Sequence, residues 1–292
     1  MEVLKIEQGG GDDHDRGLPH DLGTLIERRR ALAWLGSAGL VTFLGACGDE
    51  PFFGRAEAEV TATGADGSQC VVHPQETVGP YPADGSNRAH GMLANVLDKS
   101  GIVRADMRPS LDPAQAVALG MPLELTLMLV DAGRACAPLA GHAIYLWHCD
   151  AVGRYSIYDL PEATYLRAVG VTDATGKATF TTIFPGCYPG RYPHMHFEVY
   201  PSLAKATSYA NRILTSQIAM PEDVCHAVYQ GGADYRESIT HFARSPLARD
   251  GIFANNTPKQ LAAQTPSLTG DVVGGYRGGV VIGIKGEEVA PT

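Results

Sequence analysis

The sequence predicts an all-β fold with an antiparallel β-sandwich core, short helices and long loops. Every second residue from Leu123 to Leu129 is a leucine, which is the period-two pattern of a strand with one buried face. Short runs of β-branched and aromatic residues also recur along the chain, separated by turn-forming residues. Many short strands of this kind favour two packed antiparallel sheets.

The remaining elements follow in order along the chain. Strands are predicted at residues 142–150, 166–172, 177–184, 194–200, 213–219 and 272–284. The stretch 173–176 has the composition of a turn and joins two of these strands. Only residues 221–229 have a clear helical signal, with proline and acidic residues in the first turn.

The first 47 residues are predicted to be an export signal. Arginines at 28–30 precede an uncharged run at 31–46, which is the order of an n-region and an h-region. The arginines resemble a twin-arginine signal. Residues 44–47 resemble a lipoprotein lipobox, in which Cys47 becomes the lipid-bearing first residue. The alternative is a transmembrane anchor, but the 16 residues of the run fall short of the roughly 20 that span a bilayer.

Three segments are therefore expected: a signal segment at 1–47 that ends at the lipobox Cys47, a flexible linker at 48–73 and one β-sandwich domain at 74–292. The protein is expected to be exported to the periplasm or cell surface and tethered to the membrane through Cys47. The sequence leaves its oligomeric state open.

Charge and cysteine usage narrow the class of function. The net charge is -9 and no basic stripe is present, so nucleic acid is an unexpected partner and a small molecule is favoured. Five cysteines follow Cys47, and their odd number leaves at least one unpaired. Their connectivity is open, and the lack of a CxxC pair argues against a thiolate metal site. These cysteines are Cys70, Cys136, Cys149, Cys187 and Cys225.

A metal site is predicted around His194 and His196. Side chains alternate along a strand, so these two imidazoles point the same way, roughly 6.5 Å apart along the chain. A His-x-His pair alone is better explained by core or surface histidines than by a metal site. The preceding glycines and prolines, however, indicate a loop that returns Tyr188 over the strand, with Arg191 facing whatever the metal binds.

Five stretches in this order resemble the intradiol ring-cleavage dioxygenases, the family of protocatechuate and catechol dioxygenases. Residues 185–189 match its Pro-Gly-x-Tyr-Pro stretch and residues 191–196 its Arg-x-x-His-x-His stretch. Residues 146–156 look like its Trp-x-Ala-x-x-x-Gly-x-Tyr stretch, 214–217 like the segment that carries a glutamine, and 76–81 like its opening loop. The resemblance spans residues 74–284, and the loop between Tyr188 and His194 is shorter than in the cytoplasmic enzymes, which leaves the substrate open.

The resemblance implies an iron(III) site held by Tyr155, Tyr188, His194 and His196. Phenolate oxygens and imidazole nitrogens suit this hard ion better than thiolates would. The family's reaction inserts O2 between the two hydroxyl-bearing carbons of a catechol and yields a muconate-type diacid.

Catalytic roles follow from the same resemblance. It makes Tyr188 both ligand and base, while Arg191 stabilises charge on the ring and Gln217 adds a hydrogen bond. Read individually, Tyr155 is a packed strand aromatic, Arg191 a surface ion-pair partner and Gln217 a strand-edge residue. His148 lies beyond the four matched ligand positions and is expected to serve the core or the surroundings of the site.

Two rival functions stay open. One is a lipid-anchored β-sandwich that binds a carbohydrate or a protein without a metal. The other is a copper or zinc protein that uses the His-x-His strand without ring cleavage.

Overall fold

The computed structural model describes residues 61–64, 69–112 and 116–285. The predicted signal at 1–47, Cys47 included, lies outside these ranges, as do residues 48–60 of the predicted linker. Within the described residues, no helix is both long and apolar enough to cross a membrane.

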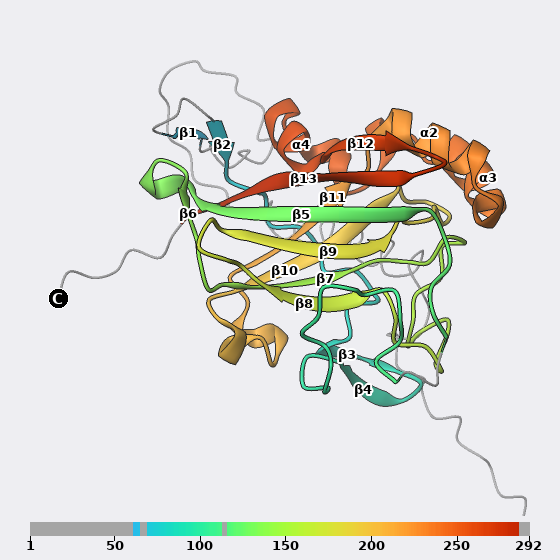
Figure 1. The fold of residues 1–292 in the computed structure, drawn as a ribbon, viewed down its shortest axis with the longest axis horizontal. Helices are drawn as coiled ribbons and strands as arrows, with labels where there is room; N and C mark the ends of the chain where they lie inside the picture. Colours follow the sequence, from blue (N-terminus) through green and yellow to red (C-terminus); the bar gives the residue numbers. More distant parts are fainter. Residues whose placement is uncertain (1–60, 65–68, 113–115, 286–292) are drawn as a thin grey trace, which may run out of the picture. The chain divides into compact units, whose positions relative to one another are not determined.

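Two main sheets form the domain. One has the strand order β11-β10-β7-β8 and the other the order β12-β13-β5-β6, with β9 also paired to β5. In Figure 1, β13, β5 and β9 lie side by side and the helices gather beside β12 and β13. The strands are β5 (Pro122–Asp131), β6 (Ala137–Pro138), β7 (Ala143–Trp147), β8 (Arg167–Val171), β9 (Lys177–Ile183), β10 (His194–Tyr200), β11 (Leu214–Ala219), β12 (Ser267–Asp271) and β13 (Gly275–Ile284).

The prediction of a strand-rich domain is confirmed, but the prediction that all pairing is antiparallel is wrong. Strand β13 pairs with β5 in parallel, from Tyr276 beside Leu123 to Ile284 beside Asp131. Parallel neighbours need a long crossover connection, and the chain between β5 and β13 supplies one. The predicted strand at 272–284 also begins too early, because Val272 to Gly274 form the turn between β12 and β13.

Helices contribute more than the sequence pattern indicates. Helix α2 (Glu222–Gly231) matches the predicted segment, whereas α3 (Arg236–Arg244) and α4 (Pro258–Gln264) were not predicted. Helix α4 begins with a capping box between Thr257 and Gln260, a signal that the sequence does contain. Short 3-10 helices occupy Ala132–Arg134, Leu203–Lys205, Tyr209–Asn211, Ala233–Tyr235, Leu247–Arg249 and Phe253–Asn255.

The two sheets share one hydrophobic core. The alternating leucines of β5 are buried there with Ile144 and Leu146 of β7 and with Phe197 and Val199 of β10. Because side chains alternate along β7 and β10, the residues between these apolar ones face the other way. Trp147, His194 and His196 are therefore presented on the face of their sheet that points away from this core.

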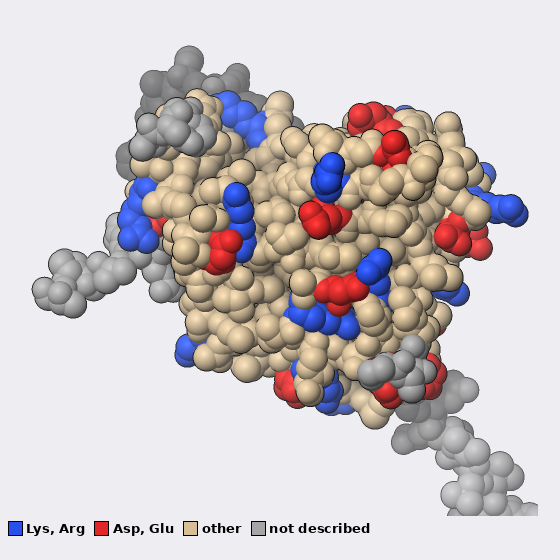
Figure 2. All heavy atoms as spheres, viewed as in Figure 1, with Lys and Arg blue, Asp and Glu red and all other residues tan. Residues whose placement is uncertain are grey.

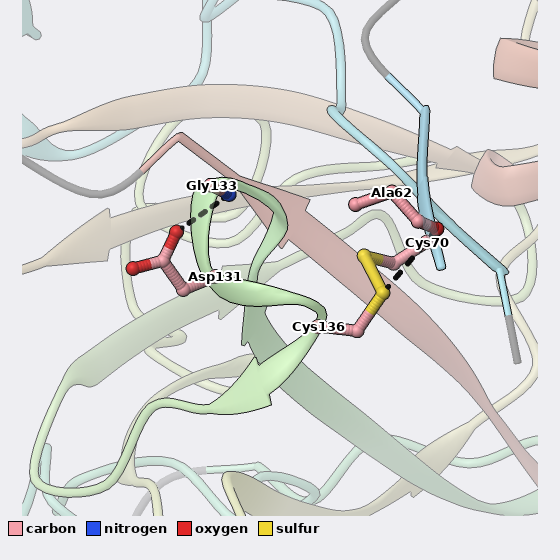
Figure 3. Close-up of a disulfide and its surroundings, with 5 residues drawn as sticks. All are labelled: Ala62, Cys70, Asp131, Gly133 and Cys136. Atoms are coloured by element: carbon pink, nitrogen blue, oxygen red, sulfur yellow. Dashed lines mark hydrogen bonds between the residues drawn. A yellow bond between two sulfur atoms is a disulfide. The ribbon is translucent and has the colours of Figure 1, made fainter. Parts of the chain in front are cut away.

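The predicted flexible linker ends earlier than residue 73. Strands β1 (Thr61–Thr63) and β2 (Gln69–Val71) form a hairpin, and Cys70 in β2 is disulfide-bonded to Cys136 beside β6. Figure 3 shows this bond joining the hairpin to the segment that follows Asp131. A covalent link over 66 residues orders a segment whose composition alone predicts a tether. Cys149, Cys187 and Cys225 are buried free thiols.

Candidate active site

Two histidines meet at the start of β10. His194 and His196 are almost fully buried, and their Nε2 atoms lie 3.1 Å apart. Their separation along the strand predicts this shared direction, and the structure confirms it. Strand β11 runs alongside and places Gln217 opposite His196.

A glycine-rich loop brings Tyr188 over these rings. Gly190 has a φ of 83° in the turn that follows Tyr188, a conformation that favours glycine. The Tyr188 hydroxyl lies 3.0 Å from Nε2 of His194. Tyr188 is only partly buried, so of the two predicted tyrosine ligands it is the one nearer to solvent.

A second loop, after β7, supplies Tyr155. Gly153 has a φ of 91°, and a Cβ there would lie 2.9 Å from Cβ of Tyr188, so the two loops approach too closely for any side chain. The Tyr155 ring meets Tyr188 edge-on at 5.8 Å between centroids and His196 at 6.3 Å. Its oxygen is buried with no hydrogen-bond partner among the described residues.

Both histidines are neutral and can offer a lone pair. Burial lowers the pKa of His194 and of His196 well below 6.5, and the nearby Arg191 charge lowers both further. Nδ1–H of His194 donates to the carbonyl of Tyr192. Its Nε2 is therefore an acceptor, and it takes the hydrogen bond from Tyr188.

The tyrosines complete a donor set that fits a metal ion. Burial raises the pKa of Tyr155 and of Tyr188, so both are neutral phenols when no metal ion is bound. A bound cation inverts this preference, because it stabilises the phenolates. A buried, unpartnered phenol oxygen next to converging imidazole nitrogens is the arrangement that such an ion would satisfy. No group of three or more His, Cys, Asp and Glu side chains in the described ranges could hold a metal, so a metal site here requires these tyrosines.

The guanidinium of Arg191 lies beside His194 and is held by hydrogen bonds to two other side chains. Its Nε donates to Asp250 over 2.9 Å, and its Nη2 donates to Gln217 Oε1 over 2.6 Å. Although burial opposes its charge, the Asp250 carboxylate helps to keep the pKa of Arg191 raised. Gln217 Nε2 in turn donates to the carbonyl of Thr77. A fixed cation and an amide thus stand beside the four candidate ligands.

All six residues predicted from the sequence lie in this one place. Trp147, which the sequence also places at the pocket, lies here too, whereas Asp250 and Gly79 were not predicted. Asp250 follows a 3-10 helix far along the chain and carries no motif. Trp147 and Gly79 contact His196. His148 lies apart from the six, with its ring nitrogens bonded to Thr182 and to the carbonyl of Cys149.

Comparison with known proteins shows which proteins this chain resembles. The sequence model of the family described as Dioxygenase matches residues 108–224. This part of the chain is therefore similar to that family. It includes Tyr155, Tyr188, His194 and His196.

Solved structures agree with the family match at the level of the fold. An intradiol ring-cleavage dioxygenase from Tetranychus urticae superposes with a TM-score of 0.54 at 23% identity, covering 76% of this chain and 98% of its own. A catechol 1,2-dioxygenase from Pseudomonas arvilla C-1 covers 94% of this chain and 72% of its own, at 17% identity and a TM-score of 0.45. No curated protein matches the sequence. The first of these two comparisons shows that the chain has a fold similar to that of the Tetranychus urticae enzyme.

Proposed function

We propose that this protein uses iron(III) to open a catechol-type ring between its two hydroxyl-bearing carbons. The observation that carries the proposal is the convergence of two phenols and two imidazoles on one buried point. Both atoms of O2 enter the muconate-type product as carboxyl oxygen, so the reaction needs no external reductant.

Tyr155, Tyr188, His194 and His196 would hold the ion. Ferric iron supplies Lewis acidity, which favours binding of the substrate through both of its oxygens. The two phenolates offset two of its three charges, which stabilises the ferric state. Buried, neutral histidines complete the set without adding charge.

Proton handling is assigned to Tyr188. It is the partly exposed tyrosine of the pair, whereas Tyr155 is buried. We assign to it the role of base that accepts a substrate proton, while the buried Tyr155 keeps its position.

Arg191 and Gln217 are assigned to the ring itself. The Arg191 guanidinium is locked by Asp250, so it faces developing negative charge without having to reorganise. Gln217, whose amide is anchored on Thr77, orients the same guanidinium and offers polar contact to the substrate.

Location is a further part of the proposal. We infer that the protein is exported and tethered to the membrane through Cys47. The arginines, apolar run and lipobox pattern of residues 28–47 support this inference. The disulfide between Cys70 and Cys136 adds support, because such bonds persist in oxidising compartments.

The charge distribution favours a small substrate over a polyanion. In the face drawn in Figure 2, basic and acidic side chains are interspersed and no continuous patch of one sign is visible. The net charge of -9 points the same way.

The test is an optical spectrum of the purified protein with metal analysis on the same sample, before and after anaerobic addition of catechol. Tyrosinate bound to iron(III) absorbs visible light, so we expect a broad band, one iron per chain, and a shift of the band on addition of catechol. Tyr155→Phe and Tyr188→Phe should each lose much of this absorbance. Tyr158→Phe is the matched control, because its hydroxyl bonds to Asn87 and to the amide of Ala83 and should leave the band unchanged.

Each contrary outcome selects a rival. A protein that stays colourless after iron reconstitution supports the binding module. Stoichiometric zinc or copper without ring cleavage supports the other metal protein. A band that survives both tyrosine substitutions refutes the ligand assignment.

A further inference from the structure

The two histidines of the site are supported in different ways. Nδ1 of His194 donates to the Tyr192 carbonyl, which is the usual support for a metal-binding imidazole. Nδ1 of His196 is buried and has no hydrogen-bond partner in the part of the chain that the structure describes. The hydrogen bond that this ring does make joins its Nε2 to Nε2 of His194, and both atoms are assigned to the metal, so the ring needs another support when a metal is bound.

A stack of aromatic rings covers one face of His196. The Trp147 ring lies nearly parallel to it, with 5.0 Å between centroids and 8° between planes. Tyr145 continues the stack at 4.8 Å and 20° from Trp147. The hydroxyl of Tyr145 donates to the Pro82 carbonyl and accepts a hydrogen bond from Arg167, so the far end of the stack is anchored.

The backbone at Gly79 also comes close to the imidazole. Gly79 has a φ of 75°, and a Cβ there would lie 3.1 Å from Cε1 of His196. A side chain at residue 79 would therefore crowd the ring.

Tryptophan is an energetically costly residue at position 147. It is fully buried, and its Nε1–H has no hydrogen-bond partner among the residues described. Burying an unpaired N–H costs free energy that an apolar side chain would avoid. A large flat surface against His196 is the property that leucine or valine would not supply.

We propose that Trp147 is a positioning residue that orients His196 for the metal by stacking, in place of the hydrogen bond that supports His194. The inference rests on the proposed function in one respect, the assignment of His196 as a ligand. The orientation of the ring can be measured without any metal.

The experiment compares Trp147→Phe, which keeps a flat ring, with Trp147→Leu, which does not. Iron(III) affinity is measured by competition with a chelator, alongside the visible spectrum and the thermal midpoint. Loss of support around a ligand typically costs 10- to 100-fold in metal affinity, so about that loss is expected for Trp147→Leu. Trp147→Phe should recover most of the affinity and restore the position of the visible band.

Phe180→Leu is the matched control for a merely structural effect. Phe180 is fully buried in the core between the sheets, away from the His196 face. Its replacement should lower the thermal midpoint and leave iron affinity unchanged. Equal losses of affinity in Phe180→Leu and Trp147→Leu at matched stability would overturn the proposal, as would wild-type affinity in Trp147→Leu.

A metal-free measurement separates this proposal from the proposed function. Ring protons of His196 should show an upfield ring-current shift in the NMR spectrum of the wild-type apoprotein, and Trp147→Leu should remove it. Failure of the wild type to bind iron would refute the proposed function alone. Ring-proton shifts that are the same in wild type and Trp147→Leu would refute the stacking role, whatever the metal result.

Discussion

Replacing Asp250 by asparagine should both destabilise the protein and slow the reaction. The Asp250 carboxylate accepts two hydrogen bonds from Arg191 and others from the backbone amides of Tyr192, Ile252 and Phe253. The side chains of Arg191 and Asp250 are 4% and 0% exposed, so the substitution leaves a buried charge without its partner.

Breaking a buried pair of this kind costs about 3 to 5 kcal/mol. For a domain of this size, each kcal/mol lowers the thermal midpoint by roughly 2 to 4 °C, so a fall of about 6 to 20 °C is expected. A guanidinium that is free to shift by an ångström should also lower kcat/KM by about 10- to 100-fold.

The assay pairs thermal unfolding with steady-state ring-cleavage kinetics. Arg154→Gln is the matched control, because it removes an ion pair with Asp150 in which the arginine is 53% exposed. That variant should lose at most about 1 kcal/mol. The reasoning fails if Asp250→Asn loses no more stability than Arg154→Gln, or if its kinetics are those of the wild type.

Two further predictions concern stability. Reducing the disulfide, or replacing Cys70 and Cys136 by serine, should lower the free energy of unfolding by about 4 kcal/mol, because the bond closes a loop across 66 residues. Denaturant melts with and without reductant measure this loss, and reductant should have no effect on the double-serine variant. Acid should also destabilise the protein through His73 and His148, whose pKa values burial lowers from 6.5 to about 4. Since the unfolded chain binds more protons between pH 6.5 and 4, the stabilising contribution is complete above this window and is lost as the pH falls through it, by about 3 kcal/mol per histidine. Melts of wild type and His73→Gln at pH 7 and pH 4.5 check this, and equal losses in the two proteins would contradict it.

Local patterns predicted most of the strands, and the resemblance to a dioxygenase family predicted the six candidate site residues. The period-two leucines of β5 and the spacing of His194 and His196 depend only on the alternation of a strand, so both could be read from the sequence. The capping box of α4 is an equally local signal, so the start of this helix is also predictable from the sequence.

What could not be predicted depends on contacts between distant segments. Asp250 reaches Arg191 across 59 residues, and Cys70 finds Cys136 across 66. The parallel pairing of β13 with β5 and the stacking of Trp147 on His196 also form only when the sheets assemble. No spacing in the chain records such pairings, because the intervening loops determine them.

The parallel pairing of β13 with β5 has a consequence for the order of events in the cell. Leu123 and Tyr276 meet across 153 positions, a highly non-local contact that is slow to form. Strand β5 leaves the ribosome well before β13. The edge of β5 that pairs with β13 is therefore unpaired during synthesis. The sheet is therefore complete only after the whole domain has been synthesised.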